Sequence, residues 1–199
     1  MCFSLYYFGP IPYYQKLAEQ KEVVLDVHEP FRKQTWRSRA EILGANGKLL
    51  LSVPVIRPDG KDTQMKDILI AEAEDWRKDH WKAIESAYRH APYFFFYGEQ
   101  IKSLIYDDYQ RLSQLNLSIF EKVNNWLDLD LNYRVTENTI KEKSEIDFMK
   151  AFERKKLNQD QKSYIQVFSD KLPFFSNLSI LDLIMNLGPL ARNYLTKTI

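Results

Sequence analysis

Charged and titratable side chains concentrate between Asp26 and Arg39. A carboxylate and an imidazole, Asp26 and His28, are followed by four cations within fourteen residues; the cations are Arg32, Lys33, Arg37 and Arg39. Histidine changes charge near neutral pH, so His28 is suited to general acid or base catalysis. Guanidinium groups match phosphate and carboxylate oxygens in a bidentate geometry. The segment therefore predicts a site for an anionic small molecule such as a sugar phosphate or a nucleotide-sugar.

The apolar run before this segment predicts a buried strand over residues 23–27. Alternation along that strand places Asp26 and His28 on one face at its carboxyl end, where open α/β sheets bind ligands. We therefore assign proton transfer to His28 and its orientation to Asp26. A polar strand end that is simply exposed to solvent explains the two residues equally well.

A second strand, predicted over residues 35–42, places Arg37 and Arg39 on the same face. With Lys33 and Gln34 they form the predicted anion-binding set. Trp36, Trp76 and Tyr88 are the rings predicted to stack on a sugar or base. Alternating charges on a solvated strand face are the competing interpretation.

His80 is the third predicted catalytic residue, on a helix expected over residues 75–91. A buried imidazole held by a hydrogen bond is the more common role for a histidine at such a position. The three histidines, at positions 28, 80 and 90, include no H-x-x-x-H pair, so no metal site is predicted.

The order of patterns predicts an α/β fold with a mixed sheet. Residues 3–8, 13–20 and 23–27 read as strand, helix and strand, and this crossover implies parallel pairing. Asn46-Gly47 is a strong hairpin signal, since a type I′ turn needs positive φ at both central residues. It would join strand 35–42 to a strand at residues 49–53.

The second half is predicted to be mainly helical, and we treat residues 1–199 as one domain. Within it, 1–72 is mainly strands with one short helix, 73–130 is helical, and 131–199 is mixed and ends in a helix. Strands are predicted at 66–70 and 164–168, and a helical stretch at 99–127 that a break near Asn116 could divide. A short strand and a charged helix are predicted within 132–161, and a Ser179–Asp182 capping box opens a C-terminal helix.

Composition excludes several classes of protein. A net charge of +1 argues against nucleic acid as a partner, and no apolar run reaches the roughly 18 residues that a membrane span needs. The single cysteine, Cys2, excludes an intrachain disulfide and favours a cytoplasmic location. The sequence identifies neither a cofactor nor an oligomeric state.

Several motifs recur in one order along nearly the whole chain. They are Tyr7-Phe8-Gly9-Pro10, Asp26-Val27-His28, the 33–39 segment, Ala45-Asn46-Gly47, Leu51-Ser52-Val53-Pro54, Trp76, His80-Trp81, residues 88–94, residues 177–183 and Asn186-Leu187-Gly188-Pro189. In these motifs the chain resembles the WbqC-like family. The resemblance implies a role linked to O-antigen or other surface-polysaccharide gene clusters, and it supplies no established catalytic residue.

The sequence thus predicts a cytoplasmic transferase in surface-polysaccharide or sugar-precursor biosynthesis, acting on a phosphorylated or nucleotide-activated sugar. The alternative is a non-catalytic protein that docks polysaccharide-biosynthesis enzymes through its aromatic surface. Binding of single-stranded nucleic acid is disfavoured by the near-neutral charge.

Overall fold

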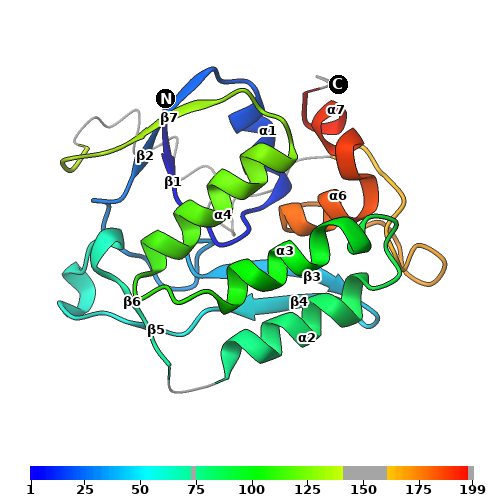
Figure 1. Cartoon of the computed structure of the whole chain (residues 1–199), viewed down its shortest axis with the longest axis horizontal. Helices are drawn as coiled ribbons and strands as arrows, with labels where there is room; N and C mark the ends of the chain where they lie inside the picture. Colours follow the sequence, from blue (N-terminus) through cyan, green and yellow to red (C-terminus); the bar gives the residue numbers. More distant parts are fainter. Residues whose placement is uncertain (73–74, 141–160, 197–199) are drawn as a thin grey trace.

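Three parallel strands form the sheet that positions the candidate site (Figure 1). A computed structural model describes residues 1–72, 75–140 and 161–196. Strand β2 (Glu22–Asp26) lies in the centre, between β1 (Cys2–Ser4) and β7 (Asn132–Val135). Helix α1 (Ile11–Ala18) connects β1 to β2, which confirms the predicted parallel β-α-β unit.

Strand β1 is shorter than the predicted 3–8, because the chain leaves the sheet after Ser4. The backbone of the next residues bonds elsewhere. The Leu5 carbonyl accepts a hydrogen bond from the Asn116 side chain, and the Tyr7 amide donates to the Trp36 carbonyl at 2.9 Å. Phe8 has a φ of 43°, which turns the chain away from an extended path.

A hairpin of β3 (Arg39–Gly44) and β4 (Gly47–Ser52) forms where it was predicted. Its turn residues are Ala45 and Asn46, and of the pair Asn46-Gly47 only Gly47 has a positive φ, so the predicted type I′ turn centred on Asn46-Gly47 was wrong. The strand expected at 35–42 starts only at Arg39. Gln34 has a φ of 62°, and the Ser38 amide closes a turn onto the Thr35 carbonyl. Arg37 therefore lies in a turn, so the predicted strand face carrying both Arg37 and Arg39 was wrong.

The helical stretch expected over residues 99–127 forms two helices, and the break between them lies before the position considered near Asn116. They are α3 (Phe94–Tyr106) and α4 (Leu112–Trp126), and α3 packs beside α2 (Trp76–Tyr88), the helix predicted at 75–91. The break has a tertiary cause. Ile70 and Leu112 donate backbone hydrogen bonds across this connection, to Gln110 and Ile68 respectively, which requires extended backbone there.

The smaller elements complete the fold. Strand β6 (Leu69–Ile70) is shorter than the predicted 66–70 and pairs with β5 (Val55–Ile56). Short 3-10 turns span Gly60–Asp62, Met65–Asp67 and Gly188–Leu190, and the chain closes with α6 (Ile180–Leu187) and α7 (Ala191–Thr196). The charged helix predicted within 132–161 falls largely on residues 141–160, outside the described part of the chain.

No strand forms at Tyr164–Phe168, where one was predicted. The Gln166 side chain instead bonds both the amide and the carbonyl of Phe175, which holds this segment as a loop. The predicted capping box is half formed: Ser179 Oγ accepts from the Leu181 amide, but Asp182 turns into the core. There it accepts hydrogen bonds from Tyr88, Tyr164 and Gln166.

Helix α6 ends at Gly188, whose φ of 54° and ψ of −127° strongly favour glycine. A Cβ at this position would lie 2.4 Å from Tyr93 Cδ1. Gly188→Ala should therefore lower the free energy of unfolding by roughly 2–4 kcal/mol, measured by denaturant unfolding. Gly60→Ala is the control, because Gly60 also has a positive φ but nothing within 4 Å of a Cβ. Equal losses in the two variants would contradict the steric argument.

Candidate functional site

The carboxyl ends of the three parallel strands bring polar side chains together. Ser4 ends β1 and is paired in register with Asp26, which ends β2. Thr136 directly follows β7, and its amide bonds the Leu25 carbonyl. All three residues are buried. This edge of the sheet is where α/β folds generally bind ligands.

Asp26, Thr136 and His28 form a hydrogen-bonded chain. Thr136 Oγ1 donates its proton to Asp26 Oδ1 at 3.0 Å and lies 3.2 Å from His28 Nδ1. Because that hydroxyl has a single proton, it accepts from Nδ1, and a neutral His28 is protonated on Nδ1. Nε2 then has a free lone pair, as a general base requires. Asp26 also accepts from the His28 amide at 2.9 Å, so it orients the ring through Thr136 rather than directly.

Arg37 and Glu29 form a buried ion pair beside this chain. Arg37 Nε donates to Glu29 Oε1 at 2.9 Å, and Arg37 Nη2 donates to Glu29 Oε2. The same Nη2 also donates to Ser4 Oγ at 3.1 Å, which links the pair to the end of β1. The Arg37 charge is thus already balanced inside the protein, so its main role is positional.

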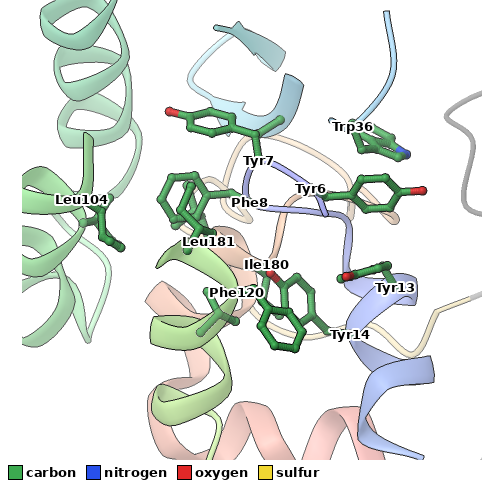
Figure 2. Packing of buried hydrophobic residues seen from close by; sticks show 14 of the residues in the cluster. Tyr6, Tyr7, Phe8, Tyr13, Tyr14, Trp36, Leu104, Phe120, Ile180 and Leu181 are labelled. Carbon is green, nitrogen blue, oxygen red and sulfur yellow. The ribbon is translucent and has the colours of Figure 1, made fainter. Parts of the chain in front are cut away.

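Helix α4 and the segment after β1 fix the position of Arg37. Asn116 Nδ2 donates to the Arg37 carbonyl at 2.7 Å, and the guanidinium lies 5.9 Å from the centre of the Tyr6 ring. In Figure 2, Tyr6 and Trp36 direct their polar ends to one side of this segment, while Tyr7 and Phe8 point the other way. Trp36 Nε1 is buried and has no hydrogen-bond partner among the residues that the structure describes.

The other predicted binding residues lie at different depths. Lys33 and Gln34 are exposed, and Arg39 is partly exposed at the start of β3. Trp36, Trp76 and Tyr88 are buried, so the described structure places these three rings in the hydrophobic core.

His80 belongs to a separate hydrogen-bond network in the core. Its Nε2 accepts from the Ser52 amide at 3.1 Å, and its Nδ1 lies 2.8 Å from Tyr7 Oη. A neutral His80 is therefore protonated on Nδ1 and donates to Tyr7. Burial lowers the pKa of His80 to about 4. The structure supports the alternative role considered for this residue, a buried imidazole that joins α2 to β4 and the N-terminal segment.

The lowered pKa of His80 predicts a pH dependence of stability. Between pH 6.5 and about 4 an unfolded His80 binds a proton and the folded one does not, so the stability gained above pH 6.5 is lost as the pH falls. The full effect is about 3 kcal/mol. Denaturant unfolding of the wild type and His80→Gln across this range should show a steeper loss in the wild type; parallel profiles would contradict the assignment.

A second buried group, Asp182, also makes the stability depend on pH. The wild type and His80→Gln must therefore be compared at the same pH. Burial raises the pKa of Asp182 above 3.8, so it binds a proton more tightly when folded, and its contribution falls as the pH rises through that raised pKa. This slope is opposite in sign to that of His80. It is common to the wild type and His80→Gln, and it cancels in their difference.

Ser4, Glu29 and Thr136 belong to the site but were not predicted from the sequence. Thr136 follows a short predicted strand, but only the pairing of β7 with β2 places it beside Asp26. Glu29 is a carboxylate within the charged segment, and this feature of the sequence could have indicated it as the partner of Arg37. Ser4 carries no distinguishing signal of its own.

Comparison with known proteins agrees with the sequence motifs. Residues 5–159 match the WbqC-like protein family. The chain belongs to that family. This member is also 25% identical over 118 residues to the uncharacterized protein Rv1507c of Mycobacterium tuberculosis; the match covers 59% of this chain and spans about half, 51%, of that relative. No solved structure matches the chain.

Within residues 1–72, 75–140 and 161–196, no group of three or more His, Cys, Asp or Glu side chains is arranged to hold a metal ion. Within the same ranges, every helix is too short or too polar to cross a lipid bilayer.

Proposed function

We propose that this WbqC-like protein is a cytoplasmic transferase that acts on a phosphorylated or nucleotide-activated sugar at the carboxyl edge of the β1–β2–β7 sheet. The observation that carries the proposal is the Asp26–Thr136–His28 chain. It fixes the imidazole and leaves Nε2 available to remove a proton from an acceptor hydroxyl. Such proton removal is what a sugar hydroxyl needs to become a nucleophile.

Arg39 and Lys33 are the cations we assign to the anionic part of the substrate. Both are at least partly exposed, and neither forms an ion pair with another described residue. Arg37 helps to hold the site together by donating hydrogen bonds to Glu29 and Ser4. The sequence prediction gave Arg37 and Arg39 the same anion-binding role. Here Arg39 keeps that role, and Arg37 is a supporting residue.

A thermal-shift screen tests this proposal. The probes are nucleotide-sugars, sugar phosphates, nucleotides and acyl donors, and a ligand at 100 times its Kd should add about 2.7 kcal/mol of stability. Combined Lys33→Gln and Arg39→Gln replacements should abolish most of the shift. Arg89→Gln, which removes an exposed cation at the end of α2, should leave it intact. No shift with any probe would overturn the proposal.

A docking protein without catalysis is the second candidate. Phe95 and Phe96 at the start of α3 are 90% and 64% exposed, which is unusual for adjacent aromatic residues and typical of an interaction surface. This function predicts that Phe95→Ser with Phe96→Ser abolishes association with a polysaccharide-biosynthesis enzyme in analytical ultracentrifugation. The transferase proposal predicts instead that this variant keeps its ligand-induced thermal shift.

A further inference from the structure

A groove of about 740 Å³ lies between α3 and α4, two helices that pack side by side (Figure 1). The volume is within the range of about 300–1,000 Å³ typical of small-molecule sites. None of its lining residues belongs to the candidate site at the sheet edge. Asn116 turns toward that edge from α4, whereas Ser118, Glu121 and Asn125 line the groove.

The groove has a buried aliphatic residue beneath it and two aromatic residues at one end. Leu104 is buried beneath it, Tyr106 is 46% exposed at the end of α3, and Tyr109 lies in the connection to α4. The Tyr109 hydroxyl interacts with Ser118 and Asp107, two other residues that line the groove. A tyrosine ring offers an apolar face together with a polar edge, which suits the face of a sugar ring.

The walls carry planar polar groups. Gln100 and Asp107 come from the α3 side, and Glu121 and Asn125 come from α4. The Gln100 amide bonds the Phe96 carbonyl and the Trp126 indole, and one oxygen each of Asp107 and Glu121 accepts from Asp108 and Tyr133. The second carboxylate oxygens add acceptors, and the Asn125 amide supplies both a donor and an acceptor. Adjacent hydroxyls on a sugar ring have the matching pattern, because each hydroxyl donates and accepts.

Charge and shape exclude the main competitors. Asp107 and Glu121 outnumber Lys122, so the part of the lining that the structure describes has no positive excess for a phosphate. The walls are helices, which offer no strand edge to an extended peptide. Among the described residues that line the groove, Leu104 is the sole aliphatic one, which is too little for an amphipathic helix.

We propose that the α3–α4 groove binds a neutral carbohydrate chain. It is a second site, separate from the sheet edge, and it does not depend on the proposed transferase activity. Tyr106 supplies the stacking face, and Asn125 and Asp107 supply hydrogen bonds to ring hydroxyls.

NMR titration of the full chain with maltotetraose, cellotetraose and chitotetraose tests this inference. At least one of them should give saturable amide shifts over residues 103–109 and 118–125. Tyr106→Ala and Asn125→Ala should each weaken that binding about tenfold. Phe95→Ala is the matched control, since it removes an exposed ring from the other end of the same helix, and it should not change the affinity.

Three results would overturn the inference. They are an absence of saturable shifts with all three oligosaccharides up to about 10 mM, saturable shifts confined to the sheet edge around Asp26 and His28, and equal weakening by Phe95→Ala and Tyr106→Ala. If a sugar phosphate shifts only the amides of the sheet-edge residues, that result supports the proposed function. The three oligosaccharides alone decide whether the groove binds carbohydrate.

Discussion

Arg37→Ala is expected to lower the free energy of unfolding by about 3–5 kcal/mol, measured by urea or thermal denaturation. The side chains of Arg37 and Glu29 are only 5% and 8% exposed, so removing the guanidinium leaves a buried carboxylate without its partner. Ser4 Oγ and Thr35 Oγ1 lose a donor in the same step. Replacing a whole buried ion pair by apolar residues often leaves the stability unchanged, whereas removing one partner lowers it strongly.

Two variants separate this effect from a general loss of charge. Replacing both partners, with Arg37→Met and Glu29→Leu, should recover most of the stability, because no charge then remains buried. Lys16→Ala breaks the exposed Lys16–Glu19 pair and should cost no more than about 1 kcal/mol. If Arg37→Ala were as mild as Lys16→Ala, the Arg37–Glu29 pair could not be a principal support of the site.

The N-terminal fold was predictable because its signals are local. Val23, Val24 and Leu25 form a short apolar run, and Val23 and Leu25 are fully buried in β2. The Asn46-Gly47 signal located the hairpin, although the turn falls on Ala45-Asn46 and only Gly47 has a positive φ. Asp26 and His28 were predicted at the carboxyl end of β2, and the structure places both there.

The remaining features depend on contacts between residues far apart in sequence. Thr136 lies 110 residues from Asp26, and only the pairing of β7 with β2 brings them together. The turn before β3 depends on Gln34 in a left-handed conformation and on the Tyr7 amide, neither of which alternation reveals. The break at residues 107–111 similarly arises from hydrogen bonds to β6 rather than from a residue that disfavours helix.

The burial of Arg37 also changes how the site is understood. A run of four cations indicates an anion-binding segment when each charge is counted as free. The structure balances one of them with Glu29 and leaves Lys33 and Arg39 closer to solvent. The chemically informative group is then the histidine, whose tautomer is set by a hydroxyl and a carboxylate, an arrangement common to catalytic bases.

His28→Gln is expected to reduce turnover by about 10²–10⁴-fold on whichever sugar substrate the thermal-shift screen identifies. The variant removes the Nε2 base but leaves Lys33 and Arg39 in place, so the ligand-induced thermal shift should persist. Thr136→Val should cause a smaller loss, because it removes the acceptor for Nδ1–H while keeping the imidazole. Steady-state kinetics on the three proteins measures both effects.

His90→Gln is the matched control, because it removes an exposed imidazole just beyond the end of α2. Its turnover should equal that of the wild type. The order of activities should therefore be wild type and His90→Gln, then Thr136→Val, then His28→Gln. Full turnover in His28→Gln would show that another group removes the proton, and a Thr136→Val loss equal to that of His28→Gln with ligand binding also lost would indicate that this chain only holds the sheet edge together.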